Sequence, residues 1–208
     1  MPRLQDFRPP LVAILRGLEP QRAAEVGSLL FDAGLRIIEV PLNRPGALLC
    51  IQSLCAIAPG DALIGGGTML SRADVDQVRA AGGRLMVSPN CNPAVIQHAV
   101  ACGMLAAPGI ATATEAFAAL EAGAHALKLF PAESLGLAGM RALLSVLPPA
   151  TPVWPVGGVT PQSMAAWVGA GATGFGIGSQ LFKPGMSLEA IGAAAREFIA
   201  AWADAALA

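Results

Sequence analysis

The chain has 208 residues, of which 54% are hydrophobic and only 13% charged, with 24 glycines and 17 prolines. This composition excludes a disordered chain and indicates a folded protein that buries much of its backbone. The formal net charge of −1 excludes a broad basic face, so we expect neither nucleic acid nor a membrane as a partner. No apolar run is long enough to cross a bilayer, and the opening MPRLQDFRPP has no apolar signal core, so we expect a cytoplasmic protein.

Strand and helix patterns alternate along the whole chain. Strands are expected within 11–17, 32–43, 62–68, 80–90, 101–109, 121–131, 151–158 and 169–179, most of them after a glycine suited to end a helix. Amphipathic helices are expected at 20–33, 45–58, 71–81, 92–101, 112–122, 137–147, 161–170 and 190–208. Four of them have capping residues, Ser71, Asn92, Thr112 and Thr160, and Pro161 follows the last cap.

Eight strand–helix units predict parallel strands with right-handed crossovers, which close most naturally as a (β/α)8 TIM barrel. We therefore predict an α/β fold with one barrel domain spanning 1–208. The alternative is an open doubly wound sheet, which is less favoured because no GxGxxG follows the first strand.

The stretch HALKLFPAE places a lysine inside an apolar strand. Period-two alternation puts Ala126, Lys128 and Phe130 on one face, which would look into the barrel, and two leucines on the other. A lysine held there loses hydration, and a neutral amine can attack a ketone to form a Schiff base. Glu39, inside the second strand, is the candidate proton shuttle.

A buried ion pair that only joins two strands is the structural alternative for Lys128 and Glu39. Ionisable groups at a barrel mouth are more often functional than structural, so we favour catalysis. The four cysteines form no CxxC pair, and we expect no histidine at zinc-ligand spacing near them, no metal site and no cofactor.

Two late strands end in glycines, in VGGVTP at 156–161 and GFGIGS at 174–179. Glycine backbone and a helix N-terminus can approach an anion closely, and the last strands of a barrel often hold phosphate. Thr68 could receive a carboxylate or simply cap a helix, and Arg16 could bind an anion or extend into solvent. These features predict a small phosphorylated keto acid as the substrate.

The motifs AILRG, IIEVPLN, IGGGT, SPN, PGIATATEA, ALKLFPAE, PVGGVTP and GIGS, in this order, resemble the 2-keto-3-deoxy-6-phosphogluconate and 2-keto-3-deoxy-6-phosphogalactonate aldolases. The resemblance covers nearly the whole chain. It implies a metal-free class I aldolase on a (β/α)8 barrel, typically a homotrimer, that releases pyruvate and glyceraldehyde 3-phosphate.

The resemblance also implies roles for particular residues. It makes Lys128 the Schiff-base lysine and Glu39 the general acid/base, with Thr68 and Pro89 at the pyruvoyl carboxylate. The glycine-rich ends supply the implied phosphate site, namely Gly157, Gly158, Gly178 and Ser179.

Three positions separate the branches of this family. Gluconate enzymes usually have an arginine and a threonine where this chain has Asn43 and Val156, whereas EVPLN, Arg16 in AILRG and VGGVTP match the galactonate enzymes. The FPAE element is shared with the gluconate branch, which stays open as an alternative. Two further hypotheses also stay open. The protein could be another phosphate-binding barrel enzyme, such as an epimerase or synthase, or a non-catalytic barrel that only binds a phosphorylated sugar acid.

Overall fold

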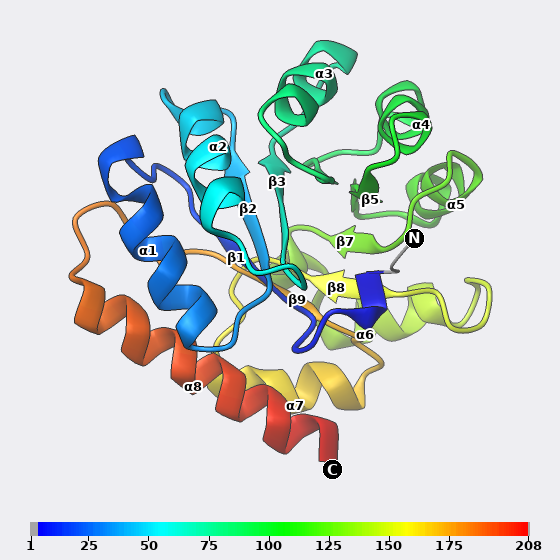
Figure 1. Ribbon diagram of the computed structural model, residues 1–208. Coiled ribbons are helices and arrows are strands. Elements are labelled where there is room, and N and C mark those ends of the chain that lie inside the picture. Colours follow the sequence, from blue (N-terminus) through cyan, green and yellow to red (C-terminus); the bar gives the residue numbers. More distant parts are fainter. Residues whose placement is uncertain (1–3, 208) are drawn as a thin grey trace.

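The computed structural model describes residues 4–207, and its helices surround a central set of parallel strands (Figure 1). The strands are β1 (Leu11–Ile14), β2 (Ile37–Pro41), β3 (Leu63–Gly67), β4 (Leu85–Val87), β5 (Leu105–Ala107), β6 (Gly109–Ile110), β7 (Leu127–Leu129), β8 (Val153–Pro155) and β9 (Phe175–Ile177). The helices are η1 (Leu4–Asp6), α1 (Pro20–Asp32), α2 (Ala47–Ile57), α3 (Arg72–Ala80), α4 (Pro93–Ala101), α5 (Ala113–Glu121), α6 (Ala132–Leu144), α7 (Pro161–Gly169) and α8 (Leu188–Leu207). The predicted alternation is confirmed for these residues, while 1–3 and 208, part of the predicted domain, lie outside them.

The strands form two parallel sheets. Six strands lie in the order β5-β4-β3-β2-β1-β9 and three in the order β6-β7-β8. The predicted fifth strand is divided into β5 and β6 at Pro108, which has no N–H to donate to a ladder. The two sheets meet at this break and again between β8 and β9, where a parallel bridge joins Val156, just after β8, to Gly176 in β9. The described chain is thus an α/β fold with nine parallel strands where the sequence predicts eight.

Alternate residues of the strands pack in two separate hydrophobic groups. The helix-facing group includes Leu127 and Leu129 of β7, as the period-two pattern predicts. The inner group contains residues of six strands, together with Leu4 and Phe7 of the N-terminal segment and Ala126 just before β7 (Leu4, Phe7, Val12, Ile37, Leu63, Leu85, Val87, Leu105, Ala107, Ala126 and Trp154). The inner side of the strands is therefore largely filled by apolar side chains.

Helix boundaries follow the local signals in most places. Ser71, Asn92, Thr112 and Thr160 each accept a hydrogen bond from a backbone N–H in the first turn of α3, α4, α5 and α7. The helix predicted at 137–147 instead begins at Ala132 and contains a non-helical residue, Gly136, with φ 66°. This difference arises because glycine reaches positive φ without a Cβ clash, so two short helices join there.

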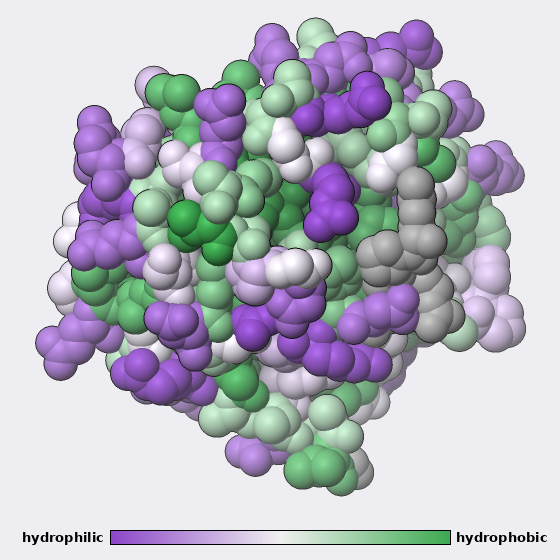
Figure 2. Space-filling model, viewed as in Figure 1, coloured by the Kyte–Doolittle hydropathy of each residue, from purple (hydrophilic) through white to green (hydrophobic). Residues whose placement is uncertain are grey.

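The surface mixes hydrophilic residues with scattered apolar ones (Figure 2). Six large hydrophobic side chains are exposed in the described part of the chain, namely Leu49, Ile57, Leu70, Phe117, Val146 and Leu207. Within residues 4–207, no helix combines the length and apolar character needed to span a membrane.

Candidate active site

Lys128 and Glu39 meet on the inner side of the strands. Lys128 is the middle residue of β7 and Glu39 the middle residue of β2, and their side chains are almost fully buried. Nζ of Lys128 lies 3.8 Å from Oε1 of Glu39. This separation is an ion-pair contact but too long for a direct hydrogen bond, so a hydroxyl or water oxygen that approaches both groups can exchange protons with them.

Burial dominates the electrostatics of Glu39. The loss of hydration raises the pKa of its carboxyl group above the ordinary value, while the charges of Lys128 and Arg16 act in the opposite direction. Oε2 is buried and has no hydrogen-bond partner among the described residues. A raised pKa makes the carboxyl group a better proton acceptor than an exposed glutamate, and a proton shuttle needs a group that can accept a proton and return it.

A glycine makes the space for that carboxylate. The main-chain pairing of β2 with β3 sets Val40 beside Gly66 and Pro41 beside Gly67. A Cβ atom at Gly67 would lie 1.7 Å from Oε2 of Glu39. The last glycine of IGGGT is therefore a steric requirement of the site, because any side chain there would displace the acid.

Lys128 has apolar neighbours as well as the acid. Its Nζ lies 5.1 Å from the centre of the Phe130 ring, on the same face of the β7 segment. A small internal cavity contains both ionisable groups and is otherwise lined by apolar residues (Val12, Ile14, Val87, Ala107, Trp154, Val156 and Gly176). The amine therefore lies beside the Glu39 carboxyl group in surroundings that are otherwise apolar.

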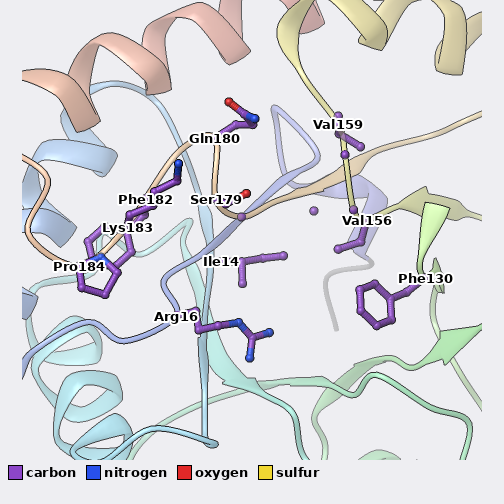
Figure 3. A pocket seen from close by; sticks show the side chains of 14 residues that line it. Ile14, Arg16, Phe130, Val156, Val159, Ser179, Gln180, Phe182, Lys183 and Pro184 are labelled. Atoms are coloured by element: carbon purple, nitrogen blue, oxygen red, sulfur yellow. The ribbon is translucent and has the colours of Figure 1, made fainter. Parts of the chain in front are cut away.

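A larger cavity of about 310 Å³ opens beside the small cavity that contains Lys128 and Glu39 (Figure 3). Ile14, Val156 and Gly176 line both spaces, so the two are contiguous. Its wall includes all four predicted phosphate-binding residues, Gly157, Gly158, Gly178 and Ser179. Gly157 and Gly158 have φ of 106° and 67°, which brings bare backbone to the cavity just before Thr160 caps α7.

Cationic side chains line the same cavity. Figure 3 shows Arg16, from the segment after β1, below Ile14, and Lys183 beside the chain that carries Ser179. A terminal guanidinium nitrogen of Arg16 donates a 2.9 Å hydrogen bond to Oδ1 of Asn43. The structure thus joins two residues that the sequence places 27 positions apart, and Asn43 holds the arginine.

Thr68 and Pro89 lie at the ends of neighbouring strands but outside the linings of both cavities. Thr68 has φ 55°, a left-handed conformation that is uncommon for a residue other than glycine. Such backbone strain is concentrated at functional positions. Pro89 contacts Gly109, where a Cβ would lie 2.4 Å from the Pro89 carbonyl carbon, and Gly109 pairs with Lys128.

Sequence patterns did not point to several residues of the site. Lys183 and Gln180 follow the last strand in a loop without a motif, and Ile14 looks like an ordinary strand residue, yet all three line the larger cavity. Gly67 was indistinguishable from its glycine neighbours. Lys183 alone had a usable signal, since it is a cation a few residues after GFGIGS.

The expectation that no histidine lies at zinc-ligand spacing near a cysteine is wrong for Cys102, whereas the expected absence of a metal site stays a prediction. His98 precedes Cys102 by four residues on α4, which is a spacing that places both side chains on one helix face. Asp76 of α3 adds a carboxylate, and one ligand atom from each of the three lies within 4.8 Å of the others. The acidic partner of His98 is 22 residues away in sequence, so only the fold reveals it.

Known proteins resemble the chain over nearly its full length. A family model described as KDPG and KHG aldolase matches residues 7–192. A protein from Rhizobium meliloti (strain 1021) named "Probable 2-dehydro-3-deoxy-6-phosphogalactonate aldolase" is 47% identical over 184 residues, which cover 88% of this chain and 87% of the relative. The Escherichia coli (strain K12) "2-dehydro-3-deoxy-6-phosphogalactonate aldolase" is 46% identical over 197 residues, 94% and 96% of the two chains. A solved structure described as "Native KDPGal structure" has a TM-score of 0.94 and 43% identity and covers 97% of this chain and 98% of its own.

Proposed function

This chain belongs to the KDPG and KHG aldolase family, and from that premise we propose that it is a class I aldolase that cleaves 2-dehydro-3-deoxy-6-phosphogalactonate to pyruvate and D-glyceraldehyde 3-phosphate. The observation that carries the proposal is the buried pair of Lys128 Nζ and Glu39 Oε1, 3.8 Å apart, beside a cavity with glycine-rich and cationic walls. A purely structural ion pair would not need that adjoining space.

Schiff-base formation begins with a neutral amine. Lys128 can give a proton to Glu39, because burial raises the pKa of the carboxyl group and the two groups are adjacent. The amine then adds to the C2 carbonyl of the substrate, and the carbonyl oxygen takes up a proton to give a carbinolamine. Protonated Glu39 gives its proton to the departing hydroxyl, and water leaves as the iminium ion forms.

Bond cleavage uses the same two groups. The Glu39 carboxylate removes the proton of the C4 hydroxyl, the C3–C4 bond breaks, and its electron pair moves to the iminium nitrogen to give an enamine. Glyceraldehyde 3-phosphate leaves. Glu39 then returns the proton to C3, and water hydrolyses the new iminium ion to release pyruvate and the free Lys128. These steps need no metal or other cofactor.

Substrate recognition follows from the cavity walls. The phosphate fits against Gly157, Gly158, Gly178 and Ser179, where backbone groups and the α7 N-terminus favour an anion. We assign the C1 carboxylate to Thr68 and Pro89, which lie at the ends of neighbouring strands beyond the linings of the two cavities. With the phosphate and the carboxylate bound at these two places, the substrate lies across the strands with its C2 atom near Lys128.

The preference for the galactonate epimer rests on Val156, Arg16 and Asn43. Val156 lines both cavities and offers no hydroxyl to the C4 position, where the two epimers differ. The Arg16–Asn43 hydrogen bond fixes the guanidinium on the β1 side of the cavity. The galactonate names of the two relatives at 47% and 46% identity support the same choice.

We also propose that the strands act as one closed (β/α)8 barrel in a single domain. The carbonyl of Pro108 accepts from the Lys128 N–H and the bridge between Val156 and Gly176 links β8 to β9, which supports closure at both junctions between the sheets. Three copies would form a homotrimer that covers part of the exposed apolar surface. A cytoplasmic location suits the four free cysteines.

The direct test compares the two epimeric substrates. Turnover of the 6-phosphogalactonate and 6-phosphogluconate keto acids is followed by coupling pyruvate to lactate dehydrogenase. We expect a higher kcat/KM for the galactonate epimer, and no pyruvate from either substrate with Lys128→Met. A higher kcat/KM for the gluconate epimer would reassign the substrate. Pyruvate release by Lys128→Met would rule out the lysine Schiff base, and no pyruvate from either substrate with the parent enzyme would favour an epimerase, a synthase or a non-catalytic barrel.

A further inference from the structure

Three potential metal ligands from two helices meet on the outer surface, away from the strand ends. Nε2 of His98 lies 2.8 Å from Oδ1 of Asp76 and 3.9 Å from Sγ of Cys102. Asp76 belongs to α3, His98 to the last turn of α4, and Cys102 is the residue at the C-terminal cap of α4. We propose that these residues form a binding site for a borderline-soft divalent transition metal, represented by Zn²⁺.

The geometry fits a shared ion. A tetrahedral zinc with bonds of about 2.0–2.3 Å holds neighbouring ligand atoms about 3.3–3.7 Å apart. The two measured distances lie on either side of this range, and both involve the same nitrogen of His98. An ion bound to Nε2 therefore requires Asp76 to withdraw slightly and Cys102 to approach slightly. Asp76 is free to adjust because 61% of its side chain is exposed.

The chemistry of the donor set favours zinc over hard cations. A thiolate and an imidazole are poor ligands for Mg²⁺ or Ca²⁺, which prefer oxygen, but good ligands for Zn²⁺. The carboxylate and thiolate together neutralise a divalent charge. Three protein ligands leave a fourth position for water, as in other open zinc sites.

An ordinary ion pair between His98 and Asp76 does not account for Cys102. The thiols of Cys50 and Cys91 donate to backbone carbonyl oxygens, of Leu18 and Glu115 respectively, as structural cysteines do. Cys102 instead faces a ring nitrogen that already has a carboxylate partner. Without an ion, the Cys102 thiol has only a weak contact with the His98 ring. With an ion between Sγ, Nε2 and the Asp76 carboxylate, the thiol would gain a strong metal–ligand bond.

The expected consequence is stabilisation. The ion would join α3 to α4, which pack against each other, at the end of α4 where the chain turns toward the start of β5. This place on the outer helices is separate from the inner side of the strands, where Lys128 and Glu39 lie. The proposal is therefore independent of the aldolase reaction, and metal binding should change the unfolding equilibrium without being needed for turnover.

The test uses the full-length protein, stripped of metal with a chelator and then titrated with Zn²⁺ against a chromophoric competitor. We expect one ion per chain, with a dissociation constant on the order of 1 μM. At a free Zn²⁺ concentration 100 times that constant, the folded-to-unfolded ratio should rise about 100-fold, or about 2.7 kcal/mol. Mg²⁺ should give no shift.

Co²⁺ reports the ligands directly, because a thiolate bound to it gives a charge-transfer absorption. Cys102→Ser should abolish that absorption and weaken Zn²⁺ binding at least about tenfold, and His98→Asn and Asp76→Asn should weaken it too. Cys91→Ser, which alters another half-buried thiol, is the matched control and should bind like the parent. No binding at about 100 μM Zn²⁺, or equal binding by the Cys102→Ser variant, would overturn the proposal.

Discussion

Replacing Gly67 by alanine should disable catalysis without unfolding the protein. A Cβ at this position would lie 1.7 Å from Oε2 and 2.7 Å from the carboxyl carbon of Glu39, whereas ordinary contact begins near 3.4 Å. The carboxylate must therefore move by about 1.7 Å, the difference between the two values. Because a misplacement of about 1 Å costs about 100-fold, kcat should fall by at least that factor, or about 2.7 kcal/mol in the barrier.

The neighbouring glycine supplies the matched control. A Cβ at Gly66 would lie on the helix side of β3, 2.6 Å from Cγ2 of Val78 and 2.9 Å from the sulfur of Met69. Gly66→Ala should therefore lower the free energy of unfolding by about 1–3 kcal/mol through overpacking, with kcat of the folded enzyme nearly unchanged. The assay is pyruvate release coupled to lactate dehydrogenase, with urea unfolding for both variants. The reasoning is refuted if folded Gly67→Ala retains kcat within about threefold of the parent.

Three further predictions concern the same site. Glu39→Gln should become more stable relative to the parent as pH rises. Burial raises the pKa of Glu39 in the folded state, so the protonated carboxyl group stabilises the parent fully below about pH 4.5, and this contribution is lost as pH rises through the folded-state pKa. Urea unfolding of both proteins across pH tests this, and a free-energy advantage of Glu39→Gln that shrinks with rising pH contradicts it. Thr68→Gly should relieve the strain of φ 55° and so leave the unfolding midpoint unchanged or higher, while KM rises; a clearly lower midpoint argues against strain. Lys183→Gln should raise KM about fivefold for the phosphorylated substrate, with no such effect on an unphosphorylated analogue if the cation meets phosphate.

Much of the fold can be predicted from local sequence. Period-two alternation placed Leu127 and Leu129 against the helices and Lys128 on the inner side, and the structure confirms this division. Capping residues such as Ser71 fixed helix starts because a side-chain oxygen meets an orphan N–H within one turn. The break at Pro108 and the kink at Gly136 were missed, since each depends on how backbone pairing resolves around one residue.

The site was less accessible to sequence reasoning because it depends on contacts between distant residues. Polar residues at strand ends could be identified, but the Arg16–Asn43 hydrogen bond and the position of Lys183 need the assembled strands. The contact of Gly67 with Glu39 is a question of tenths of an ångström between β3 and β2. Spacing rules likewise gave no sign that Asp76 would complete a cluster with His98.

Borohydride reduction in the presence of pyruvate tests the central claim, that one buried amine captures the substrate carbonyl. The enzyme is digested afterwards and the peptide that contains residues 125–131 is analysed by mass spectrometry. We predict inactivation with one reduced pyruvoyl adduct per chain on Lys128, absent without pyruvate and in Lys128→Met. An unmodified Lys128 in enzyme that turns over, or an adduct on a different lysine, would contradict the Schiff-base mechanism.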